Sequence, residues 1–417
     1  MQIPPSSSPL RGDCRFGMTK FRSSGKSERP RAVAHKLHNF RDPNFVPSLY
    51  TDRLKHEAET IVDKLRSGGP RTLARAISMV ENHAPGWVEL LKELFPHTGR
   101  ARTIGLTGAP GAGKSTLVDQ LAKHYRNMEN PDPSRTAGPS GRSGFRQRAQ
   151  TPAKLLNLNG APDIAAADVG AADDDRYTLG IIAVDPTSPY TGGAILGDRI
   201  RMQRHFSDAG IYIRSMATRG SLGGLASTTA DAAMVLDAAG RDIVMIETVG
   251  VGQDEVDIVR VADVTVVILV PGMGDDVQSI KAGIMEIADI FVINKSDHEG
   301  AERVEREIRA LQSLATRSDN WTPPVVKTVA TEGTGIQELA SAIREYETYM
   351  QKDGLLLRRR SRNWETRLIE MLRDRMLEKA RVAVSEGDLA RYAADIAEHK
   401  CDPYSVIEHI TKTAGTG

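Results

Sequence analysis

Residues 108–115 read Gly-Ala-Pro-Gly-Ala-Gly-Lys-Ser and form a candidate phosphate-binding loop. Glycines let backbone N–H groups turn toward a phosphate, and the lysine of such a loop reaches the β- and γ-phosphates. The following serine ligates Mg²⁺, and the N-terminus of the next helix favours the same anion. The spacing therefore predicts a nucleotide site. Its phosphate-binding residues are Gly108, Ala109, Pro110, Gly111, Ala112, Gly113, Lys114, Ser115 and Thr116.

A second motif, Asn294-Lys295-Ser296-Asp297, follows the apolar run 290–293. Asp297 can accept hydrogen bonds from N1–H and the N2 amino group of guanine, which is a bidentate, charge-assisted pair. Adenine lacks this pair of donors, so the carboxylate favours guanine. Asn294 can bind the base and a neighbouring loop, and the stem of Lys295 can cover the face of the base. The two motifs together predict a site for GTP and GDP.

Two acidic residues stand at the ends of predicted strands. Asp185 follows the run 181–184, and Glu247 follows the run 243–246. Ligands bind at the carboxyl ends of parallel strands, so we expect both acids near Mg²⁺ or its waters. Gly250 and Gly252 provide the flexibility of a switch that follows the γ-phosphate. For either acid, the alternative is a turn or helix-capping role.

Two further loops, 192–202 and 271–281, combine glycines with charged residues. Asp198 is a candidate second-sphere Mg²⁺ ligand, and Lys281 a candidate partner of a switch acid. Capping or surface roles are equally open for both residues. The ten histidines show no metal-ligand spacing, and none is assigned to a metal.

The elements that position these residues alternate between strand and helix. Near-continuous Val/Ile runs separated by helical stretches predict an α/β fold, a P-loop NTPase with a mainly parallel sheet covered by helices on both faces. We expect an N-terminal helical preface at 46–100, a P-loop domain at 101–345 and a C-terminal helical arm at 346–417. The arginines at 358–360 are expected to form a solvated face. The predicted strands are 103–107, 179–184, 211–213, 243–246, 264–270, 290–293 and 325–329.

Two segments do not follow this alternation. Residues 1–45 are rich in Ser, Pro and Arg, which predicts a disordered basic extension, with a mitochondrial presequence as the alternative. Residues 127–177 lack periodicity and are predicted to be a disordered insertion. A partner-binding lid or a gene-model artefact are the alternatives for the insertion.

Composition limits the function classes. The net charge of +1 gives no global field that favours nucleic acid or a membrane surface. No apolar run approaches the roughly 20 residues that span a bilayer. Two cysteines in 417 residues imply no disulfide framework and are consistent with a reducing compartment. We therefore expect a cytoplasmic protein, or a mitochondrial-matrix protein in a eukaryote.

Seven motifs, in order, resemble the methylmalonyl-CoA mutase-associated GTPases of the MeaB type, also labelled lysine/arginine/ornithine transport ATPases. The resemblance covers roughly residues 50–126 and 178–380. The motifs lie at 108–116, 183–189, 196–202, 218–224, 247–253, 271–281 and 294–297.

The resemblance implies a SIMIBI-class G domain, a C-terminal dimerisation arm and hence a homodimer. It also implies a chaperone of an adenosylcobalamin-dependent mutase, whose cofactor loading and protection are gated by GTP binding and hydrolysis. By motif, Lys114 and Ser115 serve the phosphates and Mg²⁺, and Gln253 lies in a second switch. Asp185, Asp198 and Glu247 join the Mg²⁺ and switch network, and Lys281 lies in a third switch that senses the partner.

The chain departs from the family at the base-side loop Val329-Ala330-Thr331, where Ser-Ala is usual; the backbone contact to the base remains available. Lys114, Asp185, Glu247 and Gln253 are the residues expected to act in hydrolysis. Val251, rather than a glutamine, follows Glu-Thr-Val-Gly, which predicts weak intrinsic hydrolysis stimulated by a partner.

Two other functional classes fit the sequence less well. A metallochaperone GTPase would carry a Cys/His cluster near the switches, and the sequence has none. A transport-associated ATPase or kinase would prefer adenine, which Asp297 opposes. Among acyl-CoA mutases, the sequence leaves open whether the partner acts on methylmalonyl-CoA, isobutyryl-CoA or a related substrate.

Overall fold

The computed structural model describes residues 47–131, 175–185, 205, 208–217, 224–248, 257–272, 284–314, 317 and 319–415. Two compact units are distinguished, Pro47–Met371 and a unit that contains Leu372–Gly417. The first begins with the predicted helical preface, α1 (Pro47–Arg66), α2 (Pro70–Glu81) and α3 (Trp87–Leu94), closed by the short helix η1 (Phe95–His97). Pro70 opens α2 directly after two glycines, because proline fits the first turn of a helix.

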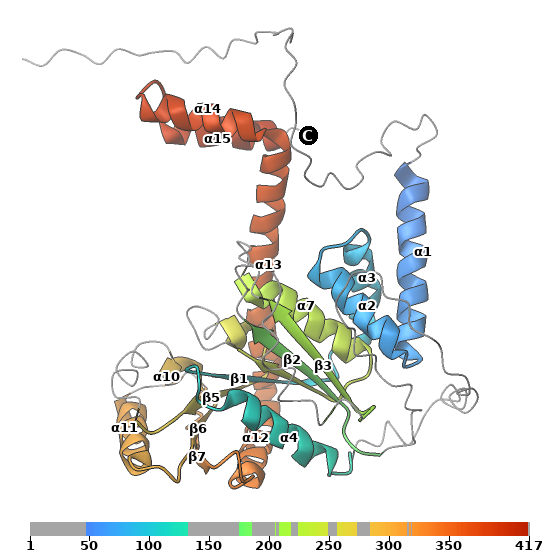
Figure 1. The fold of residues 1–417 in the computed structure, drawn as a ribbon. Helices are drawn as coiled ribbons and strands as arrows, with labels where there is room; N and C mark the ends of the chain where they lie inside the picture. Colours follow the sequence, from blue (N-terminus) through green and yellow to red (C-terminus); the bar gives the residue numbers. More distant parts are fainter. Residues whose placement is uncertain are drawn as a thin grey trace, which may run out of the picture. The chain divides into compact units, whose positions relative to one another are not determined.

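A seven-stranded sheet forms the centre of the first unit, in the order β3-β2-β4-β1-β5-β6-β7 (Figure 1). All six strand pairs are parallel, which confirms the predicted fold class. The seven predicted strands are all present, with β3 extending beyond its apolar run to Ala217. The strands are β1 (Arg102–Gly108), β2 (Leu179–Asp185), β3 (Ile211–Ala217), β4 (Ile243–Glu247), β5 (Val264–Leu269), β6 (Ile290–Asn294) and β7 (Val325–Thr328).

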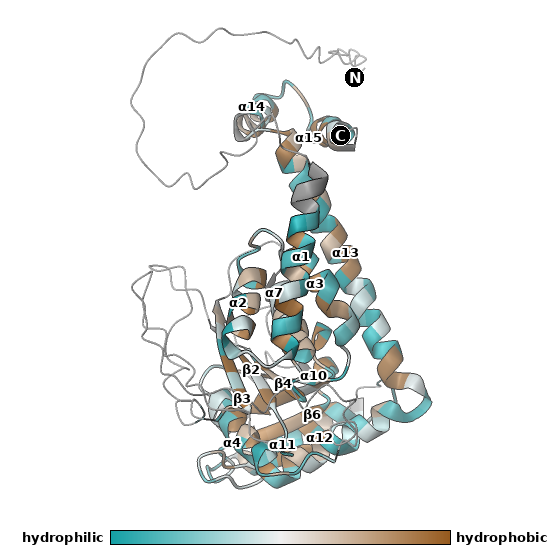
Figure 2. Cartoon of the chain, turned by 90° about the vertical axis from the view of Figure 1, so that its right-hand side faces the viewer, coloured by the Kyte–Doolittle hydropathy of each residue, from teal (hydrophilic) through white to brown (hydrophobic). Residues whose placement is uncertain are grey.

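Helices cover both faces of the sheet, whose central strands are largely apolar (Figure 2). Side chains alternate between faces, so Val266 packs with α4 (Lys114–Arg126) and α12 (Ile336–Gln351). Val267, on the opposite face, packs with α11 (Ala301–Leu314). On that same face, the preface helices and α7 (Gly224–Ala238) cover β2 and β4. Shorter helices are η4 (Ile258–Arg260), α10 (Ile284–Ile287) and η6 (Lys352–Gly354).

An aspartate stands directly before each of three strands and closes the amino edge of the sheet. The backbone N–H of each aspartate donates to the carbonyl of a threonine in or next to the adjacent strand; the aspartates are Asp242, Asp263 and Asp289. The carboxylate of each aspartate then accepts the N–H of that same residue, at 2.6, 3.2 and 2.8 Å respectively. These N–H groups lie where the ladder ends, so the carboxylates satisfy donors that would otherwise lack a sheet partner. The residues paired in this way are Thr178, Thr103 and Thr265.

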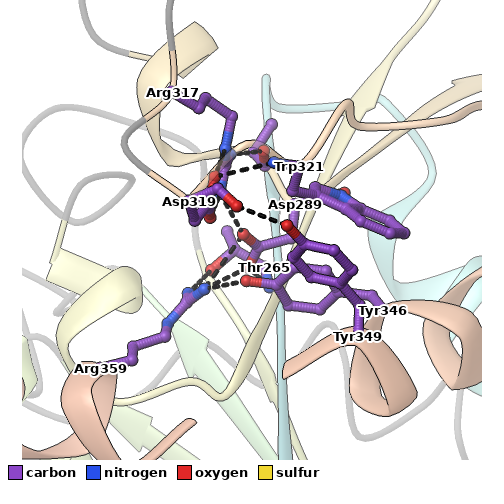
Figure 3. A network of polar contacts seen from close by, with 9 residues as sticks. Thr265, Asp289, Arg317, Asp319, Trp321, Tyr346, Tyr349 and Arg359 are labelled. Carbon is purple, nitrogen blue, oxygen red and sulfur yellow. Dashed lines mark hydrogen bonds and ion pairs between the residues drawn. The ribbon is translucent and has the colours of Figure 1, made fainter. Parts of the chain in front are cut away.

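Asp289 is the centre of a larger polar network (Figure 3). Its side chain is 1% exposed and forms ion pairs with Arg317, at 3.0 Å, and with Arg359, at 2.9 Å. Trp321 donates its indole N–H to the Asp289 carbonyl at 2.8 Å, and Tyr346 of α12 also contacts Arg359. The network therefore ties the starts of β5 and β6 to the loop before β7, to α12 and to the following helix.

That following helix, α13 (Leu355–Ala383), carries the arginine run. The expectation of a solvated face is wrong for two of the three arginines. Arg359 pairs with Asp289, and Nε and Nη2 of Arg360 each donate to one oxygen of the Asp263 carboxylate at 2.8 Å. Only the tertiary structure brings these strand-leading aspartates to the helix, and buried carboxylates without a cation would be costly.

The described ends of the predicted insertion lie together. Asn130 donates its N–H to the Asp175 carbonyl at 2.7 Å, and Glu129 and Arg176 form an antiparallel bridge. Arg126 donates to the Tyr177 carbonyl at 2.8 Å. The chain thus leaves the end of α4 and returns at the same point before β2. Residues 132–174, and with them the prediction of disorder, lie outside the described residues, as does the extension 1–45.

The second unit consists of the end of α13 with α14 (Glu386–Ala397) and α15 (Pro403–Gly415). Its small apolar core is formed by Val384, Tyr392, Val406 and Ile410. Ser385 caps α14 by accepting the N–H of Asp388 at 3.1 Å. Among the described residues of both units, no helix is both long and apolar enough to cross a bilayer.

Candidate functional site

The glycine-rich loop connects β1 to α4 at the carboxyl edge of the sheet. Gly108 has φ 143°, and a Cβ there would lie 2.2 Å from the Ile268 carbonyl oxygen of β5, so no other residue fits. Gly113 caps α4 in the left-handed conformation, with φ 89°. Lys114 is buried, and its ammonium donates to the carbonyls of Gly108 and Ala109 at 2.7 and 2.9 Å. The loop therefore surrounds a buried cation at a helix N-terminus, an arrangement that attracts a phosphate.

Ser115 and Glu247 meet at the same edge. Glu247, the last residue of β4, is paired in register with Leu106 of β1 and is 4% exposed. The Ser115 hydroxyl donates to Glu247 Oε1 at 2.6 Å. A hydroxyl and a carboxylate oxygen in contact are hard donors of the type that Mg²⁺ takes, so these two residues fit the predicted metal.

Asp185 ends β2 at this edge as well. Ala183, two residues earlier in β2, is in register with Glu247, and Asp185 itself is in register with Ala217 of β3. The Asp185 side chain is outside the described part of the structure. The other predicted metal and switch residues lie in segments that the structure leaves undescribed, and their roles stay predictions: Asp198, Gly250, Gly252, Gln253 and Lys281.

Asn294 connects three loops of the site. Its side chain is buried, and Nδ2 donates to the Ala112 carbonyl of the phosphate loop at 2.8 Å. Its Oδ1 accepts from the Thr328 hydroxyl at 3.0 Å and from the Ala330 N–H at 3.1 Å. We expected Asn294 to bind the base and a loop; the described bonds of its side chain go to the phosphate loop, to the last residue of β7 and to the base-side loop, and its contact with a base stays a prediction. Its position thus sets the distance between the phosphate loop and the base-side loops.

Lys295 and Asp297 follow Asn294 in the chain and are more exposed than it is. Lys295 has a positive φ of 54°, and its ammonium donates to the Gly111 carbonyl at 3.1 Å, so its stem passes from the base-reading loop to the phosphate loop. Asp297 is about half exposed, at 53% of its side chain, and lies 3.7 Å from the His298 imidazole. The carboxylate is therefore accessible to a base seated between the two loops.

The base-side loop follows β7. Val329 donates its N–H to the Thr334 carbonyl at 3.1 Å, which closes the tight turn 329–334. Ala330 is buried against Asn294, and Thr331 is exposed. Replacement of the usual serine by Val329 therefore leaves the turn and its backbone groups intact.

Sequence reasoning missed three threonines of the site. Thr328 binds Asn294, while the buried hydroxyls of Thr107 and Thr248 bind each other. The available signal was a hydroxyl residue at or shortly after the carboxyl end of a predicted strand, because burying a hydroxyl is costly unless it is paired.

Comparison with known proteins agrees with this geometry. The family model "Methylmalonyl Co-A mutase-associated GTPase MeaB" matches residues 73–130 and 172–385, which leaves most of the predicted insertion unmatched. A relative from Pyrococcus abyssi is 42% identical over 357 residues, covering 85% of this chain and 96% of its own. GTPase ArgK of Escherichia coli is 33% identical over 71% of this chain and 77% of its own.

Two further matches come from a mammal and from a solved structure. The Mus musculus protein named methylmalonic aciduria type A homolog, mitochondrial, is 32% identical over 79% of this chain and 73% of its own. The crystal structure of an LAO/AO transport system kinase is 24% identical with a TM-score of 0.56, covering 85% of this chain and 96% of that one, which shows a shared fold. From the family match and these identities, the chain belongs to the MeaB family of methylmalonyl-CoA mutase-associated GTPases.

Proposed function

We propose that this protein binds and hydrolyses GTP as the chaperone of an adenosylcobalamin-dependent acyl-CoA mutase, and that its nucleotide state gates the loading and protection of the mutase cofactor. The observation that carries the guanine-nucleotide part is the hydrogen bond from Asn294 Nδ2 to the Ala112 carbonyl. It links the phosphate loop to the loop that contains the half-exposed Asp297 carboxylate. The mutase part is supported by the family description.

The residues of the site divide the chemistry between them. The loop amides and Lys114 bind the phosphates, and Ser115 with Glu247 would hold Mg²⁺, which neutralises phosphate charge when it is bound. Catalysis then depends on positioning and on charge stabilisation by groups already in place. Val251 occupies the position after Glu-Thr-Val-Gly where a glutamine could orient the attacking water. We therefore propose slow intrinsic GTP hydrolysis that the partner accelerates.

Helix α13 contacts elements that follow the nucleotide-site motifs, and these contacts support coupling between the nucleotide site and α13. Arg367 of α13 pairs with Asp231, a nearly buried carboxylate of α7. Glu370 of α13 pairs with Arg260 of η4, and Asn363 donates to the Val259 carbonyl at 3.2 Å. α7 begins at the last residue of the motif 218–224, and η4 begins shortly after the motif 247–253. Helix α13 therefore contacts the first described helix after each of these two family motifs.

We also propose a homodimer formed through α13. This helix exposes a row of large apolar residues at helical spacing, which water disfavours in a monomer. Replacement of Leu368 by Glu should shift the particle from dimer to monomer in light scattering, whereas Arg381→Glu, a charge reversal at an exposed position on the other side of α13, should not. A monomeric wild-type protein at micromolar concentration would contradict the proposal. The residues of this row are Leu357, Trp364, Leu368, Met371, Leu372, Met376 and Val382; Ile369 and Leu377 of α13 are exposed outside the row.

The compartment is proposed as the cytoplasm, or the mitochondrial matrix in a eukaryote, on the basis of the cysteine usage. Among the residues that the structure describes, no group of three or more His, Cys, Asp or Glu side chains could hold a metal ion.

The decisive experiment is co-purification with candidate acyl-CoA mutases in the presence of GDP or a non-hydrolysable GTP analogue. We expect one mutase to bind in a nucleotide-dependent way, to accelerate GTP hydrolysis and to gain cofactor only when GTP is hydrolysed. Turnover of tens per second by the isolated protein, or cofactor loading that is indifferent to nucleotide, would contradict the proposal.

A further inference from the structure

Two buried threonine hydroxyls meet where β1 and β4 diverge. Thr248 Oγ1 donates to Thr107 Oγ1 at 3.0 Å. The two residues are 1% and 0% exposed. They lie 141 positions apart in the chain: Thr107 stands in β1, and Thr248 directly follows β4.

The pair extends the sheet by one step beyond its last registered contact. β1 and β4 are paired up to Leu106 and Glu247, and Thr248 donates its N–H to the Leu106 carbonyl at 3.1 Å. Beyond this point β1 turns through Gly108 into the phosphate loop, while Glu247 and Thr248 begin the motif 247–253. The side-chain hydrogen bond thus links the two site segments one position beyond their last registered strand pair.

Each threonine is adjacent in sequence to a group of the phosphate and metal site. Thr107 precedes Gly108, whose carbonyl accepts a hydrogen bond from Lys114 at 2.7 Å. Thr248 follows Glu247, whose carboxylate accepts the Ser115 hydroxyl at 2.6 Å. The separation of the two threonines therefore sets the separation of the phosphate loop from the Glu247 carboxylate.

We propose that Thr107 and Thr248 are positioning residues for the phosphate and Mg²⁺ end of the site. The proposal rests on the GTPase function proposed above and adds to it the two residues that fix its geometry. An apolar pair would fill the same space, but apolar contact has no preferred direction, whereas a hydrogen bond holds two atoms at a defined distance. Such precision matters because displacement of a binding group by about 1 Å is enough to reduce catalysis strongly.

The test separates positioning from packing with a double-mutant cycle in the full-length protein. The variants are Thr107→Val, Thr248→Val and the double replacement, with Thr248→Ser to restore the hydroxyl. Two quantities are measured: the urea midpoint of unfolding, and the affinity for GDP and a non-hydrolysable GTP analogue with and without Mg²⁺. Thr328→Val serves as the matched comparison, because it removes a buried hydroxyl on the base side of the same site.

Each single valine should lower the urea midpoint, because it leaves the other hydroxyl buried without its partner. The double variant should recover the midpoint, since replacing both partners by apolar groups of the same shape is nearly neutral. In all three, Mg²⁺ should increase analogue affinity about 5–10-fold less than in the wild type, which corresponds to one hydrogen bond. Thr248→Ser should restore the Mg²⁺ effect, and Thr328→Val should weaken both nucleotides equally with and without Mg²⁺.

A double variant that recovers both the midpoint and the Mg²⁺ effect would show that the pair only packs, and would overturn the inference while leaving the GTPase proposal intact. A wild-type protein that binds no guanine nucleotide, or binds it without any Mg²⁺ effect, would overturn both. These two outcomes are distinguished by the wild-type measurement alone.

Discussion

Replacement of Asp297 by asparagine tests the base-reading assignment most directly. The substitution keeps the size of the side chain but turns one carboxylate acceptor into an amide donor. Because the side chain is about half exposed and its approach to His298 is long, at 3.7 Å, the fold should depend little on its charge. We expect the free energy of unfolding to change by no more than about 0.5 kcal/mol.

The effect on nucleotide choice should be far larger. A hydrogen bond to a charged group contributes about 1.5–3 kcal/mol, and the low end applies to this partly exposed carboxylate. Two bonds to guanine then give about 3 kcal/mol, or about 100-fold in affinity for GDP. Xanthine carries a carbonyl where guanine carries the amino group, so the side-chain amide introduced by Asp297→Asn can donate to it. XDP should therefore bind the variant at least about tenfold more tightly than it binds the wild type.

Fluorescent GDP and XDP titrations of wild type and variant measure both effects, with urea unfolding as the check on the fold. The matched control is Asp374→Asn, a carboxylate of α13 that is 40% exposed and should leave both affinities unchanged. GDP affinity within about threefold of the wild type, or no gain for XDP, would refute the assignment of Asp297 to the base.

Three further predictions follow from the described contacts. Gly113→Ala should lower GDP affinity about 10–100-fold in the same titration, because the residue has φ 89° and a Cβ would lie 2.4 Å from Asn294 Nδ2; unchanged affinity would contradict it. Asp289→Asn should lower the free energy of unfolding by about 3 kcal/mol in urea, since the largely buried Arg359 loses its paired carboxylate and Arg317 keeps only Asp319, and a loss below about 1 kcal/mol would exclude this role. Burial acts to raise the pKa of Asp208, but hydrogen bonds and charge from Arg126 outweigh it and lower the pKa. Stability from this carboxylate is present above its unfolded pKa and is lost as pH falls through the folded one, so Asp208→Asn should flatten the acid side of the stability profile; an unchanged profile would count against the pair.

Much of the fold could be read from the sequence, because it depends on local patterns. Seven apolar runs became the seven strands, and the two glycines before Pro70 separated two helices as expected. The placement of the nucleotide motifs also followed, since carboxyl ends of parallel strands share one edge of a sheet. The arginine run at 358–360 shows the limit: periodicity described the helix, but the partners of Arg359 and Arg360 lie 70 and 97 positions earlier.

The sequence by itself determined the chemical groups of the site: a glycine loop with Lys114 and Ser115, and Asp297 as the proposed reader of guanine. These depend on spacing within a few residues, where backbone geometry leaves little choice. Only the tertiary structure decided how the pieces are joined, because Asn294 reaches a carbonyl 182 positions away and Thr107 a hydroxyl 141 positions away. Such bonds form only after the sheet order has brought strands together, and no local pattern encodes which distant group will then stand opposite.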